Sequence, residues 1–159
     1  MNKREQILNL LEEYPELVRK AALLRYELRR PSTLSPSDMI DAMNFRRGLG
    51  EVPAAGSLSN KTMYIALNYR EKAEQANREL LDEIVGRLAP LERRLERLEH
   101  YVSLLSPRMA KVLRLYYFEE RLWDEIASEL GISVRSAQKL RSGAVDKLVE
   151  MYDFIEREL

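Results

Sequence analysis

A short segment near the end of the chain carries polar side chains of the kinds that recognise nucleic acid. Residues 133–145 include three basic residues and no acidic one, although the whole chain balances 26 Lys and Arg against 26 Asp and Glu. An Arg can bond a guanine edge, a Gln can bond adenine, and a Lys can bind guanine or phosphate. This composition predicts a surface for double-stranded DNA, with a solvated helix face as the alternative. The candidate DNA-binding residues are Ser133, Val134, Arg135, Ser136, Gln138, Lys139, Arg141 and Ser142.

These residues need a helix that turns one side outward. Apolar residues recur three or four positions apart through the same segment, so they mark the inward side of a helix that runs from about Val134 to beyond Leu148. Ser133 can cap its N-terminus. The polar residues near the start of this helix are therefore expected to face solvent. The inward residues are Ala137, Leu140, Ala144 and Leu148.

The residues just before this helix predict a tight corner. Gly131 follows a helix expected at about Trp123–Leu130, in a position that favours the left-handed backbone conformation. Ala127 is small where a larger side chain would push two helices apart, and Ile132 is apolar inside the angle. With a further helix at about Pro107–Glu119, the set predicts a helix-turn-helix.

The segment LSPRMAKVLRLYYFEERLWDEIASELGISVRSAQKLRSGAVDKL resembles region 4 of the sigma-70 family. The tryptophan followed by SVRSAQKL is more similar to phage or mobile-element transcription regulators of the ArpU/RinA kind. The resemblance implies that the helix after the turn enters the major groove and reads DNA through Val134, Arg135, Ser136, Gln138 and Lys139. It also implies RNA polymerase as a second partner, through a docking surface that the aromatic residues at 116–118 and 123 could form, with core packing as the alternative.

Three features depart from the pattern of sigma factors. Val134 and Ser136 stand where primary sigma factors carry larger charged residues, which argues against a standard promoter element as the target. Gly143 lies inside the recognition helix, and Asp146 would repel phosphate if DNA extended that far. No segment resembles the aromatic-rich region that melts promoters, so the chain is not expected to be a complete sigma factor.

The upstream part of the chain has helical periodicity interrupted by proline and glycine. Pro15 predicts a second helix or a kink, a short helix is expected from Ser35-Pro36 to about Asn44, and residues 45–60 are expected to form a loop. A long helix should follow to about residue 105, with a bend or break near Gly86 and Pro90. Its apolar stripe could pair within the chain as a hairpin or between chains in a homodimer. The stripe is Leu81, Ile84, Leu88, Leu91, Leu95, Leu98, Val102 and Leu105.

The sequence thus predicts an all-α protein with a helical hairpin or coiled-coil interaction region at 1–105 and a three-helix helix-turn-helix domain at 106–159. There is no cysteine, His100 is the only histidine, and Glu119-Glu120 point to different sides of a helix. No catalytic residues, metal site or cofactor are therefore expected. Without a signal peptide or membrane span, the protein is expected to be cytoplasmic. A helical adaptor or packaging-type subunit that binds no DNA is the alternative function.

Overall fold

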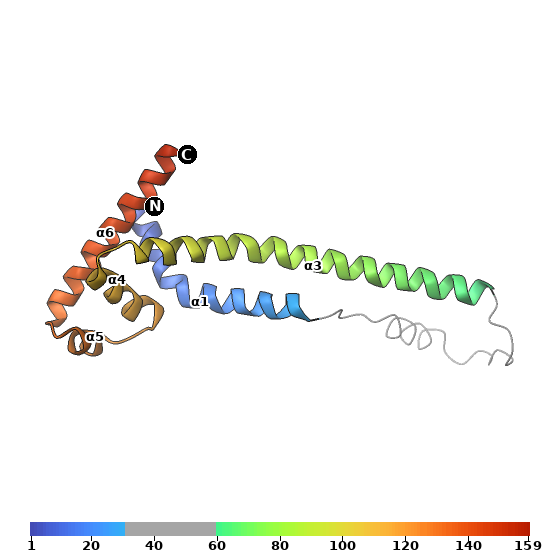
Figure 1. The fold of residues 1–159 in the computed structure, drawn as a ribbon, viewed down its shortest axis with the longest axis horizontal. Helices are drawn as coiled ribbons and strands as arrows, with labels where there is room; N and C mark the ends of the chain where they lie inside the picture. Colours follow the sequence, from blue (N-terminus) through green and yellow to red (C-terminus); the bar gives the residue numbers. More distant parts are fainter. Residues whose placement is uncertain (31–59) are drawn as a thin grey trace. The chain divides into compact units, whose positions relative to one another are not determined.

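The computed structural model describes residues 1–30 and 60–159, and the described part of the chain is all-α, as predicted. The helices are α1 (Lys3–Arg29), α3 (Asn60–Ser103), α4 (Pro107–Leu113), the π-helical turn η1 (Arg114–Phe118), α5 (Trp123–Leu130) and α6 (Val134–Glu158) (Figure 1). The expected short helix at 35–44 and the expected loop, apart from Asn60, lie outside the described residues.

Two helices continue through residues that were expected to interrupt them. Helix α1 runs through Pro15, and α3 runs through both Gly86 and Pro90. A second helix at Pro15 and a break in α3 are therefore wrong, while the alternatives of a kink and a bend stay predictions. A proline costs a helix one backbone hydrogen bond, and buried leucines on both sides of each proline keep the helix packed, as Leu11 and Leu17 do around Pro15.

The described chain forms two compact units, which do not follow the expected division after residue 105. One unit combines Met1–Leu23 with Ala89–Leu159, and the other is Leu24–Leu88. Most of α1 and the last turns of α3 thus belong with the C-terminal helices. A module of about 50 residues has little apolar area to bury by itself, so these two segments supply the core that α4, α5 and α6 need.

The core of the first unit joins residues from both ends of the chain. Leu11 of α1, Leu98 and Val102 of α3, and Leu148 of α6 are fully buried in one cluster. The rings of Tyr14 and Phe118 pack against this cluster and stack with their centroids 3.8 Å apart. The Tyr14 hydroxyl donates a 2.5 Å hydrogen bond to Glu99 Oε1.

The predicted apolar stripe of α3 is buried over most of its length. In the first unit Leu98, Val102 and Leu105 pack against other helices of the same chain. For this part of the stripe, the structure therefore shows the pairing within the chain rather than between chains. In the second unit Ile84 and Leu88 are buried, whereas Leu81 is 37% exposed. The exposed part of the stripe is therefore confined to the second unit.

We predict that Leu11→Ala lowers the free energy of unfolding of the first unit by about 2–5 kcal/mol, because it leaves a cavity in the shared core. Leu23→Ala on the same helix is the control, since Leu23 is 67% exposed, and its effect should stay within about 0.5 kcal/mol. Urea denaturation followed by circular dichroism measures both. Equal, small effects would show that α1 is dispensable for the C-terminal core.

Candidate nucleic-acid interface

The corner between α5 and α6 is a Schellman-type helix end. Gly131 has φ 64° and ψ 34°, in the left-handed region. Its N–H donates to the Ser128 carbonyl at 3.3 Å, and the Ile132 N–H donates to the Ala127 carbonyl at 3.0 Å. This pair of bonds satisfies the last carbonyls of α5 and reverses the chain. The backbone therefore turns at the glycine that the sequence singled out.

The inside of the corner is closed by small and apolar residues. Ile126 and Ala137 are fully buried, together with Leu115 of η1, and Ile132 packs against them. Figure 1 shows α5 beside the start of α6. Because Ala137 has only a methyl group, α6 can lie close to α5 and η1. This packing holds the first turns of α6 at a defined angle to α5.

The N-terminus of α6 is capped by the residue expected there. The Ser133 Oγ accepts a 3.1 Å hydrogen bond from the Ser136 N–H. The Ser133 hydroxyl also lies 2.9 Å from the Ser136 Oγ, to which it donates. Both residues are exposed. A capped helix N-terminus with exposed N–H groups favours a negative charge nearby.

Arg135, Gln138 and Lys139 are all exposed on α6. They lie on the side opposite Ala144 and Leu148, which are buried in the core. Among the residues that the structure describes, none of the three exposed side chains has a hydrogen bond or an ion pair. Their donors and acceptors are therefore available to a ligand.

Two other candidate residues make contacts within the protein. The Arg141 guanidinium lies 5.5 Å from the ring centroids of both Tyr116 and Trp123, and these two rings stack at 4.3 Å. Arg141 thus joins α6 to η1 and α5 through cation–π contacts. Burial raises the pKa of the neighbouring Tyr117, and the positive charge of Arg141 partly offsets that rise. The Ser142 Oγ accepts a hydrogen bond from Arg4.

Sequence reasoning did not find Arg4. Its Nη1 donates to Asp146 Oδ1 and its Nη2 to Ser142 Oγ, both at 3.1 Å. The neighbouring Lys3 pairs with Glu156 farther along α6. Arg4 and Ser142 are 138 positions apart in the sequence, so no local pattern could have linked them.

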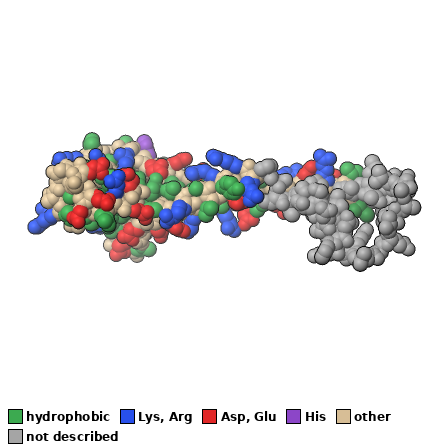
Figure 2. Space-filling view, turned by 90° about the horizontal axis from the view of Figure 1, so that it is seen from below, with side chains coloured by type: hydrophobic (Ala, Val, Ile, Leu, Met, Phe, Trp, Pro, Cys, Tyr) green, Lys and Arg blue, Asp and Glu red, His purple; other side chains and the backbone are tan. Residues whose placement is uncertain are grey.

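Charges of both signs surround this site. Figure 2, which shows one face of the molecule, has acidic and basic side chains interspersed over the C-terminal helices. Arg121 pairs with Glu129 of α5 at 3.6 Å, and Lys111 lies 3.9 Å from the same carboxylate. Unlike these two cations, Arg135 and Lys139 at the start of α6 have no ion pair among the described residues.

Residues 95–148 match the family described as sigma-70, region 4. This segment is a sigma-70 region 4-like helix-turn-helix domain. The region 4-like domain includes the last turns of α3 and most of α6, and the family is one of DNA-binding helix-turn-helix regulators. The predicted fold of this part of the chain is confirmed. Searches of curated proteins and of solved structures each found no match.

Two further properties of the described residues bear on other kinds of site. No group of three or more His, Asp or Glu side chains among them is placed to hold a metal ion. No helix in the described part of the chain is both long and apolar enough to cross a membrane.

We predict opposite effects of alanine at two glycines of the region 4-like domain. Gly131→Ala should lower the free energy of unfolding by about 1–2 kcal/mol, because an L-residue is strained at this positive φ. Gly143→Ala should leave it unchanged or raise it by up to about 1 kcal/mol, through better helix propensity. The added methyl would meet only the flexible end of Met109, at 3.2 Å.

Urea denaturation of the two variants beside the wild type measures both effects. A Gly131→Ala protein as stable as the wild type would contradict the role given to the left-handed corner. Each substitution adds the same single methyl group, so the pair compares two backbone positions rather than two side chains.

Proposed function

We propose that this protein is a sequence-specific DNA-binding transcription regulator that places the first turns of α6 in the major groove of double-stranded DNA. The observation that supports it is the exposed, unpaired set Arg135, Gln138 and Lys139 at the start of the helix that follows the Gly131 turn. In helix-turn-helix proteins the N-terminal residues of that helix contact base edges.

Each of the exposed side chains has a role that its chemistry supports. Arg135 can form two parallel bonds to guanine, and Gln138 can do so to adenine. Lys139 suits a phosphate or a guanine, and the partly exposed Val134 could contact a thymine methyl group. Ser133 and Ser136 lie at the helix N-terminus, where a phosphate is favoured.

We propose no direct base contact for Arg141 or for Ser142, whose hydroxyl accepts a hydrogen bond from Arg4. Arg141 is held over Tyr116 and Trp123, so it supports the angle of the recognition helix rather than a base contact. The same stacking supports core packing as the role of these aromatic rings. It gives no support to RNA polymerase as a partner at this position.

We further propose a homodimer through the second unit. Apolar side chains of α3 are exposed there: Leu67 by 55%, Leu81 by 37% and Val85 by 46%. Covering them with the same surface of a second copy would link two DNA-binding domains and strengthen binding to two half-sites. The resemblance to ArpU/RinA-type proteins supports a role in phage or mobile-element transcription.

The same exposed surface favours a second candidate function, that of a helical adaptor that binds another protein and no DNA. DNA binding discriminates between the two functions. The test begins with selection of bound duplexes from a random DNA pool at low salt. An adaptor would enrich no sequence, whereas a regulator would enrich one motif.

We predict that Arg135→Ala weakens binding to the selected duplex by about 1–3 kcal/mol and leaves thermal stability unchanged, because Arg135 is exposed. The matched control is Lys147→Ala, an exposed cation on another side of α6 that pairs with Glu150. Fluorescence anisotropy with labelled duplex measures both affinities. Equal losses for the two variants would mean that binding reflects charge alone and that α6 does not read sequence.

A further inference from the structure

The DNA-facing side of α6 continues beyond the residues already described. At about 100° per residue, Ser142 and Asp146 fall on the same side of the helix as Gln138, four and eight positions further on. An acid at position 146 would by itself repel phosphate. Arg4 of α1 contacts Ser142 and Asp146 on this side of α6.

Arg4 is held firmly in this position. Two of its nitrogens donate to Asp146 and Ser142 at 3.1 Å. The next turns of α1 are fixed by Ile7 and Leu11, which are buried in the core of the same unit. A guanidinium that is already ordered loses little conformational entropy when it binds a further group.

Arg4 also keeps donors for a ligand. A guanidinium has five N–H donors, of which the two contacts to α6 use two. The side chain of Arg4 is 40% exposed. Arg is well suited to phosphate because its donors form a planar fork.

The position along α6 corresponds to the edge of the groove. At about 1.5 Å per residue, Ser142 and Asp146 lie about 6 and 12 Å beyond Gln138. The major groove is about 12 Å wide and 8.5 Å deep. A helix that enters the groove by its N-terminus therefore reaches the level of the phosphates within these two turns.

We propose that Arg4 forms a phosphate-binding site with Ser142 and Asp146, so that the first turn of α1 contacts the DNA backbone beside the recognition helix. This inference rests on the proposed function, because it assumes that α6 lies in the groove. It adds a contact from Arg4, which lies 91 positions before the start of the matched domain at residue 95.

The experiment measures the affinity for the selected duplex, and for an unrelated duplex, over a range of salt concentrations. Arg4→Gln should weaken binding about five- to tenfold on both duplexes, since a phosphate contact carries no sequence information. The slope of log affinity against log salt should become less steep by about 0.9. Asp146→Asn should strengthen binding and keep an acceptor for Arg4.

The double variant separates phosphate binding from mere neutralisation of Asp146. If Arg4 binds phosphate, Arg4→Gln should cause the same loss in the Asp146→Asn background as in the wild type. If Arg4→Gln has no effect on binding in the Asp146→Asn background, Arg4 acts only by neutralising the charge of Asp146, and the proposal is wrong.

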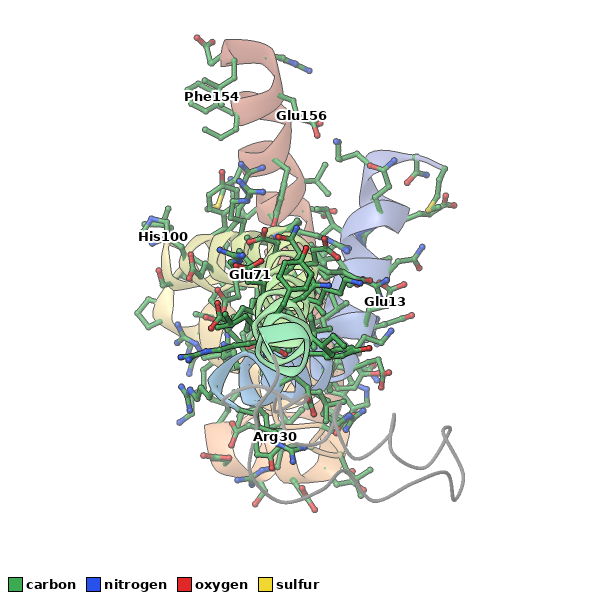
Figure 3. The ribbon with its side chains drawn as sticks, turned by 90° about the vertical axis from the view of Figure 1, so that its right-hand side faces the viewer. Glu13, Arg30, Glu71, His100, Phe154 and Glu156 are labelled. Atoms are coloured by element: carbon green, nitrogen blue, oxygen red, sulfur yellow. The ribbon has the colours of Figure 1, made fainter. Side chains whose placement is uncertain are left out.

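Lys3→Gln is the matched control. Lys3 precedes Arg4 and pairs with Glu156, about 27 Å beyond Gln138 along α6 and therefore past the groove. Figure 3 shows Glu156 on the side of α6 that faces the start of α1, with Phe154 on the other side. Each variant loses one exposed ion pair worth at most about 1 kcal/mol, so their melting temperatures should match while only Arg4→Gln changes DNA binding.

Arg135→Ala, measured in the same series, distinguishes a failure of the Arg4 site alone from a failure of the proposed function. If Arg135→Ala weakens binding and Arg4→Gln does not, the Arg4 site is wrong and the recognition helix stands. If neither variant changes binding, the proposed function is wrong, and the Arg4 site falls with it.

Discussion

The burial of α1 against α6 and the end of α3 is the contact on which the rest of the first unit depends. Leu11, Leu98 and Leu148 come from three helices, and each is fully buried in one cluster. Removing apolar area from water stabilises such a cluster by roughly 25 cal/mol per Å². Helices α4 to α6 alone would offer a core too small to fix α6. The proposed recognition surface of α6 is therefore oriented partly by residues from the beginning of the chain.

The local features of the region 4-like domain could be predicted from the sequence because their causes are local. The end of α5 and the start of α6 follow from Gly131 and Ser133, whose backbone roles depend only on near neighbours. The inward positions of α6 follow from its periodicity, and Ala137, Ala144 and Leu148 are indeed buried. Even the exposure of Arg135, Gln138 and Lys139 follows from that periodicity.

What could not be predicted depends on contacts between distant segments. The expected boundary after residue 105 followed a proline and a cap, which mark the start of α4 but say nothing about what covers it. Arg4 contacts Ser142, which is 138 positions away in the sequence, and Asp146, which is 142 positions away. Arg141 is a predicted DNA-binding residue because it is basic, yet its environment depends on how the rings of Tyr116 and Trp123 stack. The sequence leaves a second helix at Pro15 and a break at Pro90 open as alternatives, because the packing that keeps each helix continuous is not local.

The distribution of charge explains how a chain of zero net charge can present a DNA-binding surface. Net charge describes the average over the chain, whereas a phosphate responds mainly to groups within about a Debye length, roughly 10 Å at 0.1 M salt. Arg121 and Lys111 lie beside the carboxylate of Glu129 in α5, while Arg135 and Lys139 have no such partner in the described structure. Arg4 brings a cation from another helix to Asp146, the acid that would otherwise repel phosphate on the proposed DNA-facing side of α6. If α6 and Arg4 bind DNA as proposed, affinity for DNA is tied to the same α1–α6 packing that stabilises the fold, and a loosened α1 would cost the protein both stability and contacts to the DNA backbone.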